Sequence, residues 1–260
     1  MSPSQQKHLA LVTGVGRRRS IASGIALGLA RDGWDLILNH WQPYDERIDL
    51  ERGEDDPHAI ADACREYGAQ VILAPGDLGE PVFPGQLMGS GPAGRTVDGL
   101  VLAHCESVDS SILTTDIESW DRHFAVNARA SWLLIKAFAG QLPSTGPSEG
   151  GVGGRIVALT SDHTAGNLPY GASKGALDRL VIAAALELAD RGVRSNVINP
   201  GPIDNGWMDE EQRAALVRAT PAGRLGTGLD TAELVRFLFS DAGSWITGQL
   251  LHSNGGFRTS

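Results

Sequence analysis

Short apolar runs alternate with segments of helical apolar spacing along almost the whole chain. Each run is too short for a helix and is set off by glycine, proline or polar residues, as buried strands are. Parallel strands need a long crossover between them, so strands separated by helices predict a parallel sheet with helices on both faces. We therefore expect one doubly wound α/β domain over residues 1–260. The expected strands are residues 9–12, 36–38, 71–73, 99–102, 155–159, 193–198 and 249–251, and the expected helices are residues 21–30, 57–67, 120–138, 170–191 and 232–239.

Three stretches interrupt this alternation. Residues 41–56 carry seven acidic residues and are expected to loop outward. Residues 81–95 hold three prolines and four glycines, which predict an irregular or shortened helix. Residues 143–154 are rich in glycine, serine and proline and predict a mobile surface loop.

Composition argues against several classes of protein. The net charge of −9 disfavours a nucleic-acid-binding surface, which is usually basic. No apolar run approaches the ~20 residues that span a bilayer, and the polar first ten residues lack the apolar core of a signal peptide. Two cysteines, Cys64 and Cys105, are too few for a disulfide framework, and no cysteine and histidine cluster has metal-ligand spacing. We expect a cytoplasmic protein without a metal site that binds neither nucleic acid nor membranes.

The segment between the first expected strand and the first expected helix has the features of a phosphate-binding loop. It reads Thr-Gly-Val-Gly-Arg-Arg-Arg-Ser-Ile-Ala over residues 13–22. Glycines let the backbone approach a pyrophosphate, and a helix N-terminus supplies amide donors and positive potential. Ser20 replaces one of the usual glycines, and its hydroxyl could donate to a phosphate or only cap the helix. The residues expected to contact a dinucleotide here are Gly14, Gly16, Arg17, Arg18, Ser20 and Ile21.

Two features favour NADP(H) as this dinucleotide, with NAD(H) possible. The three consecutive arginines can pair with a 2′-phosphate, unless they are only solvated surface charges. The second expected strand ends in Asn39 and His40, where an NAD-binding protein would carry an acidic residue for the free ribose hydroxyl. We expect Asn39 and His40 to be among the cofactor contacts.

Tyr170 and Lys174 are four residues apart in an expected helix, so they share one face. An ammonium beside a phenol favours the phenolate and lowers the tyrosine pKa. Such a tyrosine can exchange a proton with a carbonyl or alcohol oxygen near neutral pH. The alternative is an incidental pair on an amphipathic helix.

In these segments the chain resembles the short-chain dehydrogenase/reductase family, and among its members the 3-oxoacyl-acyl-carrier-protein reductases, over nearly its whole length. The most specific element is the Tyr-x-x-x-Lys pair in the run Tyr-Gly-Ala-Ser-Lys-Gly-Ala. The resemblance implies a Rossmann-like fold and a homo-oligomer, either a tetramer or a dimer. The implied catalytic residues are Asn127, Ser161, Tyr170 and Lys174, and further implied cofactor contacts are Asp77, Leu78, Ala103, Lys174, Pro200, Gly201 and Ile203.

Some residues depart from the family pattern. Leu-Ala-His-Cys at residues 102–105 stands where the family has Asn-Asn-Ala-Gly, and we expect His104 to be a hydrogen-bonded core residue. Ser161 lies nine residues before Tyr170, closer than in most relatives, so Thr160 or Thr164 could replace it. The loop at residues 13–22 is closer to enoyl-acyl-carrier-protein reductases, but the spacing of Tyr170 and Lys174 favours carbonyl chemistry.

The resemblance implies an NADP-dependent oxidoreductase that interconverts a small-molecule carbonyl and a secondary alcohol. In this scheme the cofactor supplies hydride, Tyr170 a proton and Ser161 a hydrogen bond to the reacting oxygen, while Asn127 carries a water. Lys174 would lower the tyrosine pKa and hold the nicotinamide ribose. The alternatives are a catalytically silent dinucleotide-binding sensor or scaffold, and an enoyl-thioester reductase.

Residues 203–221 are expected to form a substrate lid. Ligands of doubly wound sheets bind beyond the carboxyl ends of the strands, and this segment must pass near that site. Its middle, residues 209–218, has a helical pattern between flexible ends. We expect Trp207 or Met208 to touch the substrate.

Overall fold

The computed structural model describes residues 7–50, 52–53, 55–143 and 153–257. Its seven-stranded sheet has the order β3-β2-β1-β4-β5-β6-β7, and every neighbouring pair is parallel. The expected doubly wound fold is confirmed, and each strand lies where the apolar runs predicted it. The strands are β1 (Leu9–Val12), β2 (Asp35–His40), β3 (Val71–Pro75), β4 (Gly99–Leu102), β5 (Arg155–Leu159), β6 (Arg194–Asn199) and β7 (Leu250–His252).

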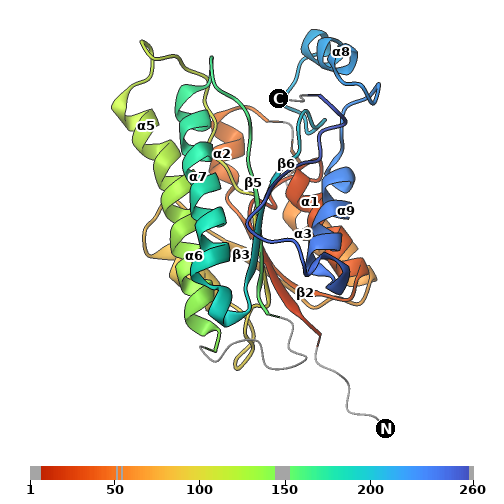
Figure 1. Ribbon diagram of the computed structural model, residues 1–260. Coiled ribbons are helices and arrows are strands. Elements are labelled where there is room, and N and C mark those ends of the chain that lie inside the picture. Colours follow the sequence, from red (N-terminus) through yellow and green to blue (C-terminus); the bar gives the residue numbers. More distant parts are fainter. Residues whose placement is uncertain (1–6, 51, 54, 144–152, 258–260) are drawn as a thin grey trace.

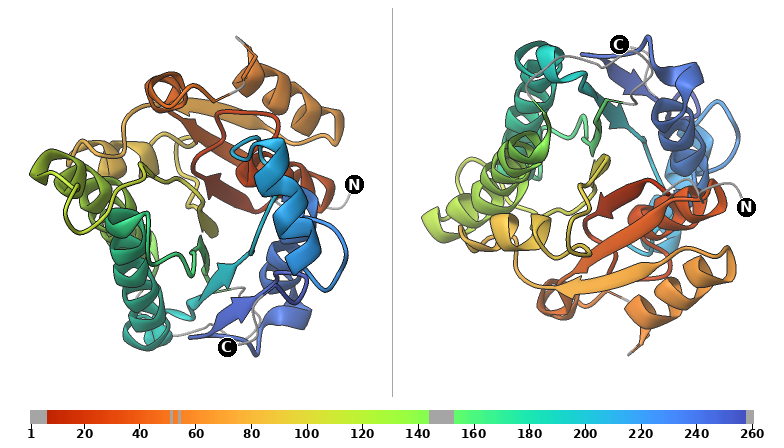
Figure 2. Two further views of the ribbon diagram at one scale, coloured as in Figure 1. Left: turned by 90° about the horizontal axis from the view of Figure 1, so that it is seen from above. Right: turned by 90° about the horizontal axis from the view of Figure 1, so that it is seen from below.

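Helices cover both faces of this sheet (Figures 1 and 2). One face carries α4 (Phe83–Met88), α5 (Ile117–His123), α6 (Ala130–Gln141) and α7 (Leu168–Glu187). The other face carries α1 (Ile21–Arg31), α3 (Asp56–Glu66) and α9 (Gly228–Phe239). The remaining helical elements are α2 (Gln42–Arg47), the π-helix η1 (Phe124–Arg129), the short 3-10 turns η2 (Ala189–Arg191) and η3 (Asp241–Gly243), and α8 (Glu210–Ala219), which stands apart from both layers in Figure 1.

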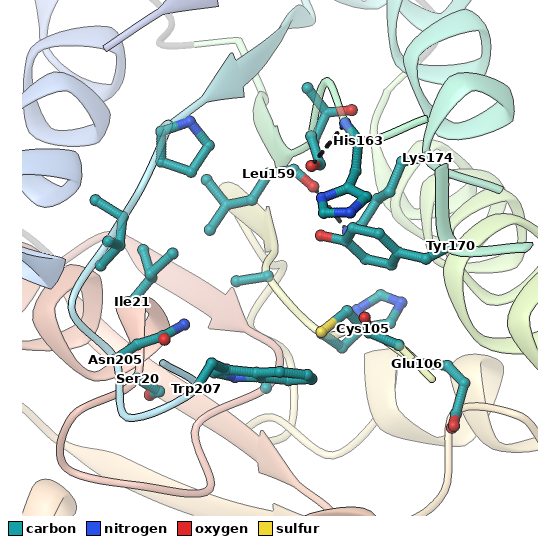
Figure 3. A pocket seen from close by; sticks show the side chains of 18 of the residues that line it. Ser20, Ile21, Cys105, Glu106, Leu159, His163, Tyr170, Lys174, Asn205 and Trp207 are labelled. Atoms are coloured by element: carbon teal, nitrogen blue, oxygen red, sulfur yellow. Dashed lines mark hydrogen bonds between the residues drawn. The ribbon is translucent and has the colours of Figure 1, made fainter. Parts of the chain in front are cut away.

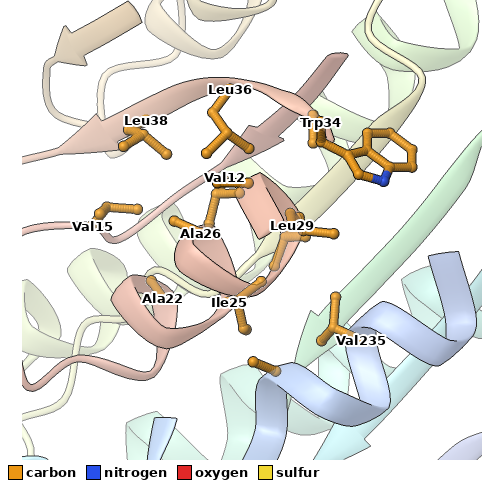
Figure 4. Packing of buried hydrophobic residues seen from close by; sticks show 14 of the residues in the cluster. Val12, Val15, Ala22, Ile25, Ala26, Leu29, Trp34, Leu36, Leu38 and Val235 are labelled. Carbon is orange, nitrogen blue, oxygen red and sulfur yellow. The ribbon is translucent and has the colours of Figure 1, made fainter. Parts of the chain in front are cut away.

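The alternation of side chains along β1 divides the core into two layers. Ala10 and Val12 belong to the cluster packed with α1 and α9, whereas Leu9 and Leu11 belong to the cluster packed with α6 and α7. Successive strand residues point to opposite faces, so a strand buried on both sides must be apolar throughout. Figure 4 shows the first of these layers, where α1 packs on β1 and β2.

Helices α1 and α9 approach each other backbone to backbone. A Cβ atom placed on Gly24 would lie 2.4 Å from the carbonyl carbon of Gly228, so neither position has room for a side chain in this arrangement. The same contact brings Gly228 close to Ser20, at the start of α1. This packing fixes the end of α1 that faces the site.

Two expectations about the interruptions can be checked. The shortened helix expected within residues 81–95 is confirmed as the six-residue α4. The expectation that residues 41–56 loop outward is wrong: α2 lies there, and Asp45 and Asp56 are buried. These carboxylates fold back because they pair with Arg17 and Arg18. Most of the loop expected at residues 143–154 lies outside the described residues.

The long helix expected at residues 120–138 is divided. It begins as α5, widens into the π-helix η1 and continues as α6. Single π-helical turns are frequent at functional sites. This one contains Asn127.

Candidate active site

A cavity of about 830 Å³ lies beyond the carboxyl ends of six strands. This is the place where doubly wound sheets bind ligands. Residues at or just after the ends of β1 to β6 line it, and they are Gly14, Asn39, Gly76, Ala103, Leu159 and Asn199.

Most of the residues predicted for the site lie on the wall of this cavity. Those on the wall are Gly14, Gly16, Arg17, Ser20, Ile21, Asn39, Asp77, Leu78, Ala103, Ser161, Tyr170, Lys174, Pro200, Gly201 and Ile203. Arg18, His40 and Asn127 are not among the lining residues.

Tyr170, Lys174 and Ser161 line the cavity, and Figure 3 shows Tyr170 and Lys174 at one side of it. The two α7 residues share a face as predicted, and the Lys174 Nζ lies 5.7 Å from the centre of the Tyr170 ring. The ammonium is buried and donates to the Leu159 carbonyl at 2.9 Å. The Ser161 hydroxyl lies close enough to Tyr170 for hydrogen bonding to lower the pKa of the phenol. The short β5–α7 loop therefore still brings Ser161 to the tyrosine.

The expected lowering of the Tyr170 pKa is not what this structure gives. Burial raises the pKa of the phenol above its usual value, and the hydrogen bond with Ser161 offsets only part of that effect. Burial likewise lowers the pKa of Lys174. The effect of burial on the pKa of Tyr170 is therefore larger than the effect expected from an ammonium one helical turn away. At neutral pH Tyr170 is consequently protonated and able to donate.

Asn127 holds the backbone together beneath the site. Its Nδ2 donates to the Glu106 carbonyl at 2.9 Å and to the Ser173 Oγ at 2.8 Å, and its Oδ1 accepts from the Glu106 amide at 2.7 Å. The side chain is buried, and all of these bonds are to protein groups. In this structure Asn127 ties the segment after β4 to α7, which differs from the expected water carrier.

His104 is a hydrogen-bonded core residue, as expected. Its Nε2 lies 3.0 Å from the Val126 carbonyl and must carry the proton, because a carbonyl can only accept. Its Nδ1 therefore accepts from the Thr13 hydroxyl at 2.7 Å. Burial lowers the pKa of His104 to about 3, so the ring is neutral.

The start of α1 has the shape and polarity that a pyrophosphate needs. Gly14 has a φ of +80°, and a Cβ there would lie 2.9 Å from the Ala103 carbonyl oxygen. Ser20 caps the helix by accepting from the Ser23 amide at 3.0 Å, which leaves its hydroxyl proton for another acceptor. The first turn contains no acidic residue. These residues fit the phosphates of a dinucleotide.

The three arginines that follow are all paired with carboxylates. Arg17 donates through Nε to Asp45 at 3.0 Å, Arg18 forms an ion pair with Asp56 at 3.1 Å, and Arg19 donates to Asp204 at 2.7 Å. In this structure the three arginines are thus engaged with carboxylates, and their contact with a 2′-phosphate stays a prediction. The acidic stretch at residues 41–56 contains two of these partners. Its excess of negative charge was the sequence feature that could have indicated ion-pair partners for the arginines.

Two further expected contacts, His40 and Asp77, differ in their surroundings. His40 is buried off the cavity wall, and burial lowers its pKa, so its neutral ring offers no charge to a cofactor. The Asp77 carboxylate accepts two hydrogen bonds from Arg122, at 2.8 and 2.9 Å. Arg122 also lies 4.7 Å from the Trp41 ring and pairs with Glu106.

Four more residues, Tyr44, Cys105, Glu106 and Arg122, also line the cavity, and no pattern in the sequence indicates Glu106 or Arg122. They lie on separate elements, so only the tertiary fold brings them together. In Figure 3 Cys105 is on the same side of the cavity as Tyr170.

Trp207 and Met208 line the cavity at the start of the expected lid. The Trp207 ring lies 6.3 Å from that of Tyr44, on α2. Helix α8 has no buried residue. The segment therefore reaches the site through its first residues and through one side of its helix, where Gln212, Ala215 and Leu216 also line the cavity.

No helix in the described ranges combines the length and the apolar character that crossing a bilayer requires. Over those same ranges, no group of three or more histidine, cysteine, aspartate or glutamate side chains is arranged to hold a metal ion.

Comparison with known proteins identifies the family. The family model described as enoyl-(acyl carrier protein) reductase matches residues 90–258. An uncharacterized oxidoreductase of Bacillus subtilis, YjdA, is 33% identical with 99% of each chain covered, and a short-chain type dehydrogenase/reductase of Picea abies is 30% identical with 95% of this chain and 91% of the relative covered. The crystal structure of the angucycline C-6 ketoreductase LanV with bound NADP has a TM-score of 0.82 and 26% identity, over 96% of this chain and 95% of that one. The chain belongs to the short-chain dehydrogenase/reductase family and is an NAD(P)-dependent oxidoreductase.

Proposed function

We propose that the protein is an NADP-dependent carbonyl reductase that interconverts a small-molecule ketone and a secondary alcohol. The observation that carries this proposal is the side of the cavity formed by Tyr170, Ser161 and Lys174. A protonated phenol lies beside a serine hydroxyl there, with a buried ammonium 5.7 Å from the ring. A carbonyl oxygen that gains negative charge needs such donors.

The residues divide the work as follows. A bound nicotinamide supplies the hydride. Tyr170 gives its proton to the substrate oxygen, while Ser161 donates a hydrogen bond to the same oxygen and orients it. The Lys174 ammonium, held by the Leu159 carbonyl, favours the phenolate that Tyr170 becomes after donating. In the reverse direction the same groups accept the proton of an alcohol.

A preference for NADP(H) forms part of the proposal. It is supported by the NADP bound in LanV and by the absence of an acidic residue within β2 after Asp35. At the end of β2, the Asn39 amide donates to the carbonyls of Ala74 and Gly76. Cofactor binding can be measured directly from the fluorescence of NADPH and NADH. We expect NADPH to bind more tightly, and tighter NADH binding would overturn the preference.

An enoyl-thioester reductase is the second candidate, favoured by the description of the matching family model. An NADPH-oxidation screen over ketones, 3-oxoacyl thioesters and enoyl thioesters separates the two. We expect turnover of a carbonyl substrate. Turnover of enoyl thioesters alone would support the second candidate, and tight NADPH binding without any turnover would support a silent sensor.

We further propose a cytoplasmic homo-oligomer, a dimer or a tetramer. Three large apolar side chains are exposed on the helical layer of α5, α6 and α7, namely Ile117, Trp132 and Leu186. Exposed apolar patches of this kind mark contact surfaces. Light scattering should give a multiple of the 27.5 kDa chain mass, and a monomer at micromolar concentration would refute the assembly.

A further inference from the structure

The first residues of the proposed lid make contacts with parts of the chain outside the lid. We call residues 203–208 the lid root. They connect the turn after β6 to α8 and place Trp207 and Met208 on the cavity wall. Helix α8 has no buried residue, and Arg213 links it to the lid root by pairing with Asp204. The position of the lid root must come from contacts that the root itself makes.

Arg17 makes one of these contacts from the phosphate loop. Its guanidinium is buried, with Nε bonded to Asp45 at 3.0 Å and Nη1 donating to the Asn205 carbonyl at 2.8 Å. One side chain thus joins three segments that are far apart in the sequence: the loop after β1, helix α2 and the lid root. Figure 3 shows Asn205 and Trp207 on the same side of the cavity as Ser20.

Arg19 makes a second contact two residues further along. It donates to one carboxylate oxygen of Asp204 at 2.7 Å, and Arg213 of α8 pairs with the other. The Asp204 amide donates to the Gly226 carbonyl at 2.9 Å, so this residue is also anchored beyond the lid. Asp204 therefore connects the phosphate loop with α8.

Helix α2 completes the support from a third direction. Tyr44 lies two residues after the start of α2, and its ring is 6.3 Å from the Trp207 ring. The Asp45 that binds Arg17 is the next residue. Arg17 and Tyr44 thus hold two successive parts of the lid root, the Asn205 backbone and the Trp207 ring.

From these contacts we infer that Arg17 and Arg19 are positioning residues for the substrate side of the cavity, in place of a direct role with the 2′-phosphate. The inference rests on the proposed function, since it assigns the lid root to a carbonyl substrate. Each arginine lies in the phosphate loop and donates a hydrogen bond to the lid root. The loop that holds the cofactor phosphates therefore also sets where Trp207 and Met208 stand.

The test uses the more exposed pair, so that folding is preserved. In the full-length protein, Arg19→Gln and Asp204→Asn should each raise the KM for a carbonyl substrate by about fivefold, with little change in kcat or in the dissociation constant of NADPH. The double variant should be no worse than Asp204→Asn alone, because both changes break one interaction. Arg224→Gln removes an arginine whose carboxylate partner is Asp230, outside the lid root, and serves as the matched control.

Hydrogen exchange provides a readout that does not depend on turnover. With NADPH bound, the amides of residues 203–208 should exchange faster in Arg19→Gln than in the unchanged protein or in Arg224→Gln. Arg17→Lys keeps the charge but cannot bridge two acceptors as a guanidinium does, and it should show the same acceleration.

Two results would overturn the inference. One is a larger dissociation constant for NADPH in Arg19→Gln and Arg17→Lys, with unchanged amide exchange rates in residues 203–208. That result would assign both arginines to the cofactor. The other is no change in either measurement. If no carbonyl substrate is found, the proposed function fails while the exchange measurement still decides the role of the arginines.

Discussion

The floor and the roof of the cavity are held in opposite ways. We define the floor as Thr13, His104, Asn127 and Ser173, which are all buried and joined by neutral hydrogen bonds. The roof is the lid root with α8, which is held by ion pairs and one ring contact and buries little of itself. A network without formal charge responds weakly to salt, whereas partly exposed ion pairs are screened by it.

The floor residues must keep their positions for catalysis, whereas a lid must move to admit a substrate. The floor sets the positions of the β4 end, the π-helix and α7, and so of Tyr170 and Lys174. In the proposed function, the roof covers the route by which a substrate enters. Segments that open for ligands come from the part of a protein with the lowest local stability. The experiments below test whether the two regions differ as their bonding indicates.

The largest effect on turnover should come from removing the Tyr170 hydroxyl. Tyr170→Phe is expected to lower turnover at least ~10²-fold, since a general acid contributes about that much. The thermal midpoint should stay within about 2 °C, because the floor bonds are untouched. Tyr44→Phe is the matched control, as its hydroxyl also lies on the wall, and it should lose far less activity. Near-normal turnover of Tyr170→Phe would show that Tyr170 is not the general acid.

The floor itself should respond in stability. His104→Leu leaves the Thr13 hydroxyl and the Val126 carbonyl without their present partner, which should cost about 2 kcal/mol in the free energy of unfolding. Denaturant titration measures this loss. The equivalent roof change, Arg19→Gln, should leave the unfolding free energy unchanged within error. Equal losses in both variants would contradict the proposed contrast.

Mild acid should weaken the floor before it affects the roof. The pKa of His104 falls to about 3 in the folded protein from a usual value of 6.5. Between these values the unfolded chain binds more protons, so stability decreases as the pH falls. From pH 6.5 to about pH 5 this single group should cost about 1.5 kcal/mol. The slope should be flatter in His104→Asn, and an unchanged slope would show that the ring titrates normally.

The pair Asp204 and Arg213 predicts the opposite behaviour in the roof. The hydrogen bond from Arg213 holds the pKa of the Asp204 carboxyl below its usual range. A carboxyl with a lowered pKa loses its contribution only when the pH falls toward that lower value. The roof pairing should therefore persist through the range in which the floor loses stability.

The parts of the molecule that could be predicted are those determined locally. Each strand is a short apolar run. A strand that is buried on both faces is apolar throughout, so it can be recognised from its own residues without knowledge of the strands beside it. The Tyr170 and Lys174 spacing is equally local, since four residues in a helix define one face. The predicted wall residues at the strand ends follow from the parallel sheet itself, which gathers every such end at one edge.

The parts that could not be predicted depend on contacts between distant segments. The partners of Arg17 and Arg19 lie on α2 and on the lid root, the latter more than 180 residues away, as Arg19 to Asp204 spans 185 positions. The raised pKa of Tyr170 comes from burial, which no spacing encodes. The π-helix that presents Asn127 arises within a pattern that indicates one continuous helix.

A moderate effect is expected when ligands bind beneath the roof. The amides of residues 203–221 should exchange several-fold more slowly once NADPH and a substrate analogue are both bound, because closure excludes water. The floor segment around His104 should show no such change, since it is already buried. Equal exchange in the lid with and without ligands would make it a fixed wall and remove the contrast in mobility.

The smallest effect should come from Arg18, between the two arginines that contact the lid root. Its side chain is 68% exposed and its ion pair with Asp56 lies outside the cavity wall. Of the three loop arginines it is the one that pairs with Asp56 and not with the lid root, and its exposed guanidinium can turn toward a 2′-phosphate while its backbone amide still donates to Asp56. Arg18→Gln should raise the KM for NADPH about threefold and leave that for NADH unchanged, because only NADPH carries the phosphate. Arg19→Gln is the control, with both cofactor constants unaltered. An equal change for the two cofactors in Arg18→Gln would mean that Arg18 acts on the shape of the loop, and the discrimination would then have to come from groups on the wall itself.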